Sequence, residues 1–204
     1  AATGLVTGEK KGRHLGVSLI LASIPIMIVG LTYGQKVKEL LFNDISVALG
    51  LIVGGLIIWW VEKHPPKINA VEVEQISIKE AFYIGLIQVL ALIPGMSRSG
   101  ATIIGAMTLG VSRKAATEFS FFLGIPVIVG AGVLDLYQSY HVFDTRLDWW
   151  VLGFGTLVSF ISALILIRVL VAYVAKRDFM IFAWYRIASG LIILLFVLTG
   201  WKLW

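Results

Sequence analysis

The residues of this chain that could do chemistry are concentrated in one short segment, Pro94 to Thr102, with the sequence PGMSRSGAT. Arg98 stands at its centre, between two uncharged stretches over residues 81–97 and 99–112. An arginine near the centre of a bilayer costs from about 2.5 to more than 10 kcal/mol, so Arg98 must face water or an anion. The alternative, in which Arg98 only pairs with a buried carboxylate or caps carbonyl groups, would leave the serines and glycines around it unexplained.

This segment has the composition of a phosphate-binding site. Hydroxyl groups can hydrogen-bond phosphate oxygens, glycines let the backbone approach them, and a guanidinium can bind two oxygens at once. The helix predicted to begin at Ser99 would add free amides and the positive end of its dipole. Gln88, on the preceding helix, could bond across the hairpin or to a ligand. We predict that Arg98, Ser97 and Ser99 are catalytic, and that Gly95, Met96, Gly100, Thr102 and Gln88 bind substrate.

Outside this segment, residues able to act as a base are sparse. His14 and His64 lie in predicted loops, and His141 lies near the opposite end of a predicted helix. Glu118 follows two cationic residues at the start of a predicted helix, where the helix dipole favours a carboxylate. A phosphatase also needs an activated nucleophile or water, a base and often a metal. The sequence predicts no cluster of metal ligands that would supply the last of these.

The composition places most of the chain in lipid. Of 204 residues, 58% are hydrophobic and only 14% are charged, and the mean hydropathy is +0.91. Soluble chains carry about 25% charged residues, so a soluble protein is excluded. The lack of cysteine in the sequence excludes disulfides, thiolate metal sites and thiol nucleophiles. The net charge of +5 comes without a basic stripe interleaved with aromatics, which argues against nucleic acid as a partner.

Uncharged stretches predict five membrane-spanning helices, since about 20 apolar residues cross the hydrocarbon core as a helix. We therefore predict an all-α integral membrane protein with one membrane domain over residues 1–204. A polar loop or tail (1–14) precedes two spans (15–63), and three spans (112–204) follow the phosphate-binding segment. The spans themselves are predicted at Leu15–Gln35, Ile45–Val61, Phe119–Tyr140, Trp149–Ile167 and Phe179–Trp201.

Residues 77–111 are predicted to form a re-entrant hairpin instead of a sixth span. The uncharged run before Pro94 gives about 13 helical residues, roughly 20 Å, and the run after it about 12 residues, roughly 18 Å. Neither piece crosses alone, and together they would enter and leave on one face with the tip near mid-membrane. Irregular backbone at that depth is tolerated only inside protein or beside a wet cavity. The tip is therefore the candidate site.

Charge counts support this topology and set its orientation. With the hairpin in place, ten Lys and Arg residues fall on one face and four on the other, so the positive-inside rule puts the first face in the cytoplasm and the C-terminus outside. The first face carries Lys10, Lys11, Arg13, Lys63, Lys67, Lys79, Arg113, Lys114, Lys176 and Arg177, the second carries Lys36, Lys38, Arg146 and Lys202, and Arg98, Arg168 and Arg186 belong to neither.

Two small-residue patterns predict close helix packing. Gly50 and Gly54 form a GxxxG pattern, and Gly153, Gly155 and Ser159 form a second stripe. We interpret both as contacts within the chain, with a homodimer face as the alternative.

The run from Gln88 to Thr102 (QVLALIPGMSRSGAT) resembles the second signature of the bacterial undecaprenyl-diphosphatase family, the bacitracin-resistance proteins. The resemblance continues through GVSR, from Gly110, and EFSF, from Glu118. It extends from about Gly12 to the C-terminus. The motif is specific because it lies in a re-entrant hairpin that is followed by the matching span.

The resemblance implies a membrane phosphatase that converts undecaprenyl diphosphate to undecaprenyl phosphate, which recycles the lipid carrier for peptidoglycan synthesis. At the matching positions, it implies that Arg98 stabilises the diphosphate while Ser97, Ser99 and Thr102 hydrogen-bond it. It also implies an inverted-topology repeat in the bacterial inner membrane, an active site open to the periplasm, a polyprenyl diphosphate partner, and a divalent cation, Mg²⁺ or Ca²⁺.

One departure and two alternatives accompany the resemblance. The family's earlier hairpin, with an acidic pair and a histidine, has no match in this sequence, so we expect either part of a longer protein or a shortened member. Broken helices near the midplane also build transporters, so a transporter or scramblase of lipid phosphate or small anions is the first alternative. A non-catalytic subunit that binds lipid diphosphate is the second.

Overall fold

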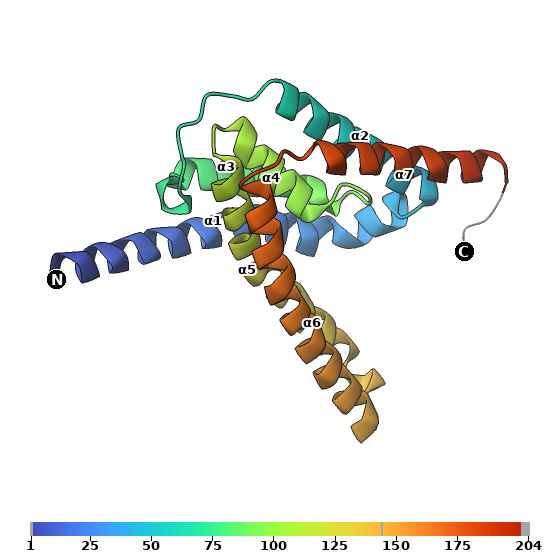
Figure 1. Ribbon diagram of the computed structural model, residues 1–204. Helices are drawn as coiled ribbons and strands as arrows, with labels where there is room; N and C mark the ends of the chain where they lie inside the picture. Colours follow the sequence, from blue (N-terminus) through green and yellow to red (C-terminus); the bar gives the residue numbers. More distant parts are fainter. Residues whose placement is uncertain (1, 144, 201–204) are drawn as a thin grey trace.

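A computed structural model describes residues 2–143 and 145–200 of the chain. Within these residues the backbone is almost entirely helical and forms no β-strand, apart from one bridge between Ala70 and Val111 (Figure 1). The α-helices and short 3₁₀ helices (η) are, in order, α1 (Ala2–Leu41), α2 (Asp44–Lys63), η1 (Val73–Gln75), α3 (Ile78–Gln88), η2 (Val89–Leu92), α4 (Arg98–Thr108), α5 (Arg113–Ser139), η3 (Tyr140–Val142), α6 (Arg146–Val174) and α7 (Met180–Leu198).

Among the described residues, five helical segments are long and apolar enough to cross a bilayer. They confirm the five predicted spans and an all-α integral membrane protein. The first four segments contain the predicted ranges completely. The fifth covers Met180–Leu198, and the predicted end at Trp201 lies outside the described residues. The segments are Gly12–Leu41, Asp44–Lys63, Arg113–Val142, Leu147–Val174 and Met180–Leu198.

The prediction of a polar loop or tail over residues 1–14 is wrong for residues 2–14, which form the first part of α1. The prediction was based on the polar composition of this stretch. Polar composition indicates exposure to solvent and does not determine the backbone conformation. Leu5, Glu9, Lys10, Lys11 and Arg13 all have high helix propensity, and no proline interrupts the stretch before the apolar span.

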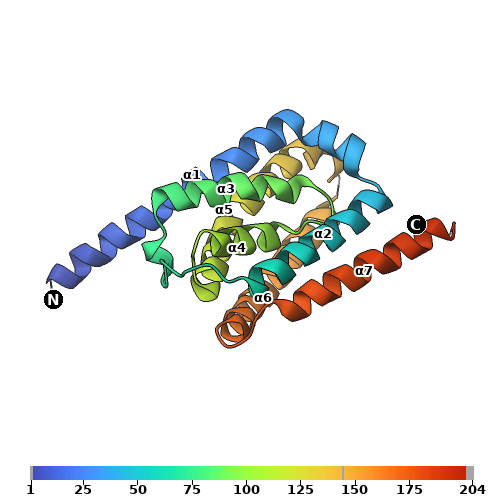
Figure 2. The same cartoon turned by 90° about the horizontal axis from the view of Figure 1, so that it is seen from above.

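Residues 77–111 form the predicted hairpin of two short helices. Ser77 caps α3 by accepting a hydrogen bond from the backbone N–H of Glu80, whose carboxylate accepts one from the N–H of Ser77 in return. α3 and α4 have 11 residues each, about 16 Å at 1.5 Å per residue, so neither crosses the hydrocarbon core. The two helices lie side by side, joined by η2 and a turn (Figure 2).

Glycines let α2 and α7 pack closely along their lengths (Figure 1). A Cβ atom on Gly55 would lie 2.8 Å from the carbonyl oxygen of Ala183, and one on Gly190 would lie 2.7 Å from that of Ala48. Gly50 meets the hairpin turn in the same way, with a Cβ 2.2 Å from the carbonyl oxygen of Pro94. The prediction that the glycines of α2 serve packing within the chain is confirmed.

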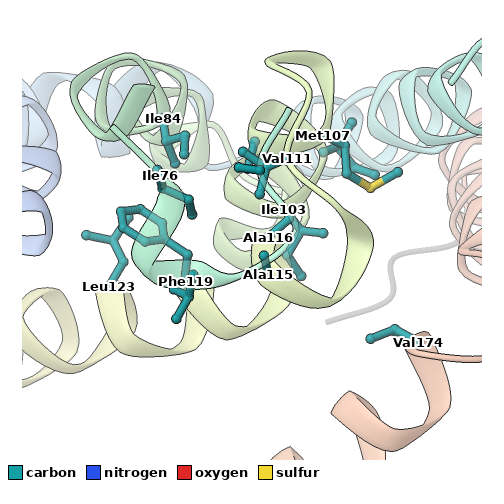
Figure 3. Close-up of a cluster of buried hydrophobic side chains, with 14 of the residues drawn as sticks. Ile76, Ile84, Ile103, Met107, Val111, Ala115, Ala116, Phe119, Leu123 and Val174 are labelled. Carbon is teal, nitrogen blue, oxygen red and sulfur yellow. The ribbon is translucent and has the colours of Figure 1, made fainter. Parts of the chain in front are cut away.

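A buried apolar cluster joins the hairpin to the N-terminal half of α5 (Figure 3). Ile84 of α3 and Phe119 and Leu123 of α5 are fully buried, and Ile76 from the preceding loop packs with them. Because α3 and α4 are too short to be held by the bilayer alone, this cluster fixes the position of the hairpin.

α6 and the C-terminal end of α5 extend away from the other helices as a pair (Figure 1). Only 6% of the apolar window of α6 is buried, and a Cβ atom on Gly153 or Gly155 would meet nothing within 4 Å. The prediction that this stripe packs within the chain is therefore wrong. Lipid tails are as apolar as leucine, so such a helix needs no partner from the same chain.

Candidate active site

Ser97 shapes the tip of the hairpin, directly before α4. Its φ of 63° is the only positive φ of a non-glycine residue in the described part of the chain, and such a conformation costs about 1–3 kcal/mol. Its hydroxyl caps α4 by accepting a hydrogen bond from the N–H of Gly100 at 3.2 Å, and it lies 3.4 Å from the hydroxyl of Ser99. The fold therefore holds both predicted catalytic serines at the N-terminus of α4, as the sequence predicts.

Gly95 fits the turn against the backbone of α2. Its φ is 83°, and a Cβ atom would lie 2.2 Å from the carbonyl oxygen of Val47. Val47 is about 5 Å from the start of α2 at Asp44 and about 24 Å from its end at Lys63. Measured from the end of α2 at Lys63, the tip therefore reaches beyond the middle of this helix. Gly95 therefore packs closely on α2, and its role in substrate binding stays a prediction.

Arg186 of α7 binds the same turn from the other side. Its side chain is buried, with 8% of the residue exposed. Its Nη2 donates hydrogen bonds to the carbonyl oxygens of Gly50 at 3.1 Å, Gly95 at 2.8 Å and Met96 at 3.1 Å. A Cβ on Gly54 would lie 2.1 Å from Nη2, so only glycine leaves room for the guanidinium.

Sequence reasoning did not select Arg186 as a site residue. The signal was available, because an arginine inside an otherwise apolar span is the same anomaly that identified Arg98. What the sequence lacked was a motif of hydroxyls and glycines around Arg186, since its partners come from α2 and the hairpin.

Arg98 turns toward α5. Its Nη1 donates a hydrogen bond to the carbonyl oxygen of Ser120 at 2.8 Å. Its Nη2 lies 2.6 Å from the place that a Cβ on Gly124 would occupy, so Gly124 makes room for it. Arg98 and Arg186 therefore attach the tip to different helices, α5 and α7. Both leave further N–H groups of the guanidinium for a ligand.

Two predicted substrate-binding residues are buried in packing contacts instead. Thr102 is fully buried, and its hydroxyl lies 2.6 Å from that of Ser120, which joins α4 to α5. Gln88 is also fully buried, and its Nε2 donates to the carbonyl oxygen of Ala22 in α1 at 3.4 Å. Both side chains make contacts between helices, and the Oε1 atom of Gln88 is buried without a hydrogen-bond partner. Their roles in substrate binding stay predictions.

A groove of about 230 Å³ opens beside the tip. Its polar lining consists of Ser97, Ser99, Gly100 and Arg186, and a neighbouring pocket of about 130 Å³ shares Gly100 and Arg186 and includes Met96. The rest of the groove is apolar or aromatic, which suits an amphiphile with an anionic head. These residues are Ile58, Ile103, Ile104, Leu170, Phe179, Phe182 and Tyr185.

The tip does not fit a divalent cation. Mg²⁺ and Ca²⁺ prefer carboxylate and carbonyl oxygens, and a site next to guanidinium groups needs carboxylates to offset their charge. No carboxylate lines the groove, and no group of three His, Cys, Asp or Glu residues comes together anywhere in the described part of the chain. The described residues therefore offer an anion site, and no step is assigned to a metal.

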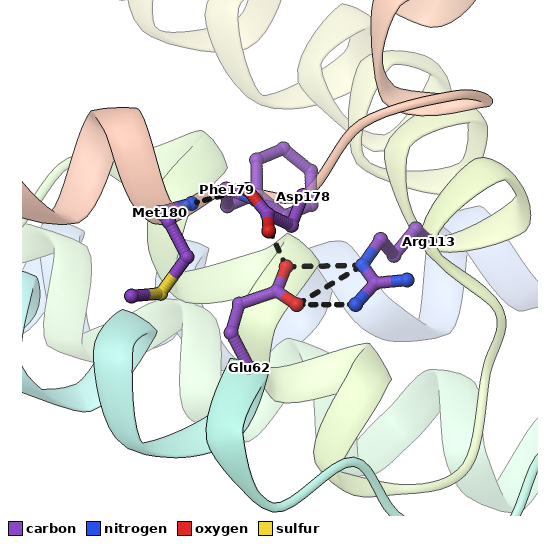
Figure 4. Close-up of polar contacts among 5 residues, drawn as sticks. All are labelled: Glu62, Arg113, Asp178, Phe179 and Met180. Atoms are coloured by element: carbon purple, nitrogen blue, oxygen red, sulfur yellow. Dashed lines mark hydrogen bonds and ion pairs between the residues drawn. The ribbon is translucent and has the colours of Figure 1, made fainter.

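A second polar cluster lies at the other end of α2 and is fully paired (Figure 4). The carboxylate of Glu62, with a side chain 2% exposed, receives hydrogen bonds from Nε and Nη2 of Arg113. It also accepts one from the backbone N–H of Phe179 at 3.0 Å. This cluster joins α2, α5 and the start of α7. It also brings together three chain segments that the charge count assigns to the cytoplasmic face.

The fold defines an all-α integral membrane protein, and the tip places serine hydroxyls and an arginine beside an apolar groove. Residues 2–192 match the family described as bacitracin resistance protein BacA, and the chain belongs to this family.

Three relatives show how far the similarity extends. The chain is 76% identical over 204 residues to undecaprenyl-diphosphatase 1 of Acinetobacter baylyi, covering all of this chain and 74% of that protein. It is 58% identical to undecaprenyl-diphosphatase of Psychrobacter cryohalolentis, covering 96% of this chain and 71% of the relative. It is 46% identical to undecaprenyl-diphosphatase 2 of Rhodospirillum rubrum, covering 92% and 68%.

Proposed function

We infer that this protein is a membrane phosphatase that hydrolyses undecaprenyl diphosphate to undecaprenyl phosphate. The relatives that bear this activity in their names match 92–100% of the chain. The observation that carries the inference is the groove, which joins two serine hydroxyls and a buried arginine to an apolar wall. The product returns the lipid carrier to peptidoglycan synthesis.

The reaction is an attack on the terminal phosphorus, with the lipid monophosphate as leaving group. Water, or a nucleophile that water later replaces, forms the new P–O bond while the bond to the bridging oxygen breaks. Donors fixed before the reaction stabilise the charge on the equatorial oxygens. We assign Ser97, Ser99 and the N–H groups of Arg98 not bonded to Ser120 to this task, with Gly100 and Met96 lining the binding site.

The apolar wall suits the isoprenoid chain of the substrate. Phe182 and Tyr185 of α7 and Leu170 of α6 line the groove next to the two serines. An isoprenoid can lie against these side chains while its diphosphate reaches the N-terminus of α4. A chain length preference would follow from this wall and not from the polar tip.

We propose that the tip opens toward the periplasm across the inner membrane and that the C-terminus is on the same side. The contact of the turn with Val47, close to the start of α2, supports this orientation, because the paired cluster at Glu62 lies at the opposite end of α2. Attachment of a cysteine-reactive, membrane-impermeant reagent to a cysteine introduced at Asn43 in whole cells tests it. Labelling only after lysis would contradict it.

We propose that Mg²⁺ or Ca²⁺, expected from the family resemblance, reaches the reaction with the diphosphate and not on ligands from the tip. We also propose a homodimer, for which the exposed stripe at Gly153 and Gly155 offers a face. Light scattering of the detergent-solubilised protein tests the second proposal. A monomer at all concentrations would contradict it.

Phosphate release and lipid movement separate the enzyme from its alternatives. The purified chain is reconstituted in vesicles with undecaprenyl diphosphate, and free phosphate and the leaflet position of the lipid are measured together, with and without chelator. Phosphate release is the expected result. Movement of intact diphosphate lipid between leaflets would indicate the transporter alternative, and binding without either effect would indicate the non-catalytic subunit.

A further inference from the structure

Arg186 has no anionic partner in the described part of the chain. Its three hydrogen bonds go to carbonyl oxygens through Nη2 alone, which satisfies donors but supplies no counter-charge. Its Nε is buried without a hydrogen-bond partner. A guanidinium stays charged under all conditions in a protein, and a buried, unpaired charge is costly. A bound anion at the tip would supply this counter-charge.

The space over Gly100 lies next to the free side of this guanidinium. A Cβ atom on Gly100 would lie 3.6 Å from Nη1 of Arg186 and 3.3 Å from the hydroxyl oxygen of Ser97. Gly100 and Arg186 line both the groove and the neighbouring pocket. A side chain at this position would stand between the two donors. As the third residue of α4, Gly100 also lies in the first turn, where the helix dipole favours an anion.

We propose that Arg186, Ser97 and the bare Cα of Gly100 form the subsite for the terminal phosphate, so that Arg186 binds substrate in addition to holding the turn. This inference rests on the proposed function. It separates the tasks of the two arginines, because Arg98 acts from the α5 side while Arg186 acts inside the groove with Ser97. The occupant has the chemistry of a phosphate with two negative charges, attached to a lipid through a second phosphate.

Gly100→Ala is the decisive variant, because alanine favours the helix and its methyl group occupies the space over Cα, 3.3 Å from Cβ and Oγ of Ser97. We expect the KM for undecaprenyl diphosphate to rise at least tenfold, with a melting temperature close to that of the unmodified chain. Gly132→Ala is the matched control, since its Cβ would meet nothing within 4 Å. An unchanged KM in Gly100→Ala would overturn the proposal. Arg186→Lys keeps the charge and loses the planar fork, so we expect a larger loss of kcat/KM.

A binding measurement tests the subsite independently of turnover. The probes are a non-hydrolysable bisphosphonate analogue of farnesyl diphosphate and the corresponding farnesyl monophosphonate. We expect the unmodified chain and Gly132→Ala to prefer the bisphosphonate by at least tenfold, and Gly100→Ala to lose that preference. Equal binding of the two probes by the unmodified chain, or an unchanged preference in Gly100→Ala, overturns the subsite. If the unmodified chain shows the preference but releases no phosphate, the proposed enzyme activity fails while the subsite stands.

Discussion

Two arginines contact α2, Arg113 at its last turn and Arg186 near its middle, and the two guanidinium groups have different partners. Arg113 meets the carboxylate of Glu62, which is also bonded to the N–H of Phe179, so that cluster is complete in itself. Arg186 meets only carbonyl oxygens and keeps an unpartnered Nε. The first arrangement fixes three helices together. The second leaves positive charge at the tip, and this difference is the ground on which we propose an anion site there and a structural role for the first cluster.

The largest effect is expected from breaking the complete cluster. Glu62→Ala leaves the guanidinium of Arg113 and the N–H of Phe179 without their partner, so we expect a loss of about 3–5 kcal/mol in the free energy of unfolding. Denaturant-induced unfolding in detergent measures it. The KM of the fraction that remains folded should stay unchanged, and a raised KM would show that this cluster takes part in the reaction.

Substitution of Arg98 at the tip should instead reduce turnover. Arg98→Ala removes donors from the diphosphate, so we expect turnover to fall by about 10²–10³-fold, as for other donors that stabilise transition-state charge. Arg98→Lys should recover little, because the two-oxygen grip of the guanidinium is lost. Initial rates of phosphate release measure both variants. Turnover close to that of the unmodified chain in either one would remove Arg98 from the site.

Gly95→Ala tests whether the tip depends on backbone contact with α2. The new Cβ would have a φ of 83° and would lie 2.2 Å from the carbonyl oxygen of Val47. We expect a loss of about 1–3 kcal/mol in unfolding free energy together with reduced turnover. Gly30→Ala, whose Cβ would meet nothing within 4 Å, is the control and should be neutral or slightly stabilising. Equal stability of the two variants would contradict the tight contact.

Ser97→Ala separates the cap of α4 from the chemistry at the tip. Loss of the hydroxyl that accepts from the N–H of Gly100 should cost about 1 kcal/mol in stability, as other caps do. Turnover should fall by about tenfold or more, because the same hydroxyl lines the groove. Ser112→Ala, which removes the corresponding cap of α5, is the control, and we expect it to lose stability without a change in KM. A similar loss of turnover in both variants would mean that capping alone explains the effect.

The smallest effect is expected for exposed charges near the complete cluster. Lys114 lies 4.0 Å from Glu72 and 3.8 Å from Glu118, and about half of its side chain is exposed. Lys114→Ala should change the free energy of unfolding by less than about 1 kcal/mol. A larger loss in the same unfolding measurement would show that the cluster around Glu62 extends to the surface.

The sequence predicted those features that depend on residues close together in the chain. The spans and the hairpin follow from the lengths of the uncharged stretches and from the Pro-Gly break. Glu118, predicted near the start of a helix, lies in the second turn of α5 and pairs with Lys114 one helical turn away. The error over residues 2–14 arose because polar composition was interpreted as loop.

The contacts that the sequence did not reveal all join distant segments. Gln88 meets Ala22, and Arg186 meets Gly50 and Met96, so no spacing in the chain marks these pairs. Thr102 could not be separated from Ser97 and Ser99 by type alone. Its position on α4 turns it to α5, where Ser120 accepts or donates the hydrogen bond.

The hydrogen bonds of Arg186 go to main-chain oxygens, and this has a consequence for how the tip can diversify. Every amino acid supplies the same carbonyl group, so the shape of the turn does not depend on which side chain stands at Met96. Met96 also lines the pocket beside the groove. Exchanges at this position can therefore reshape the pocket beside the groove while the turn keeps its form, whereas substitutions of the glycines that make room for backbone and guanidinium are not tolerated in the same way.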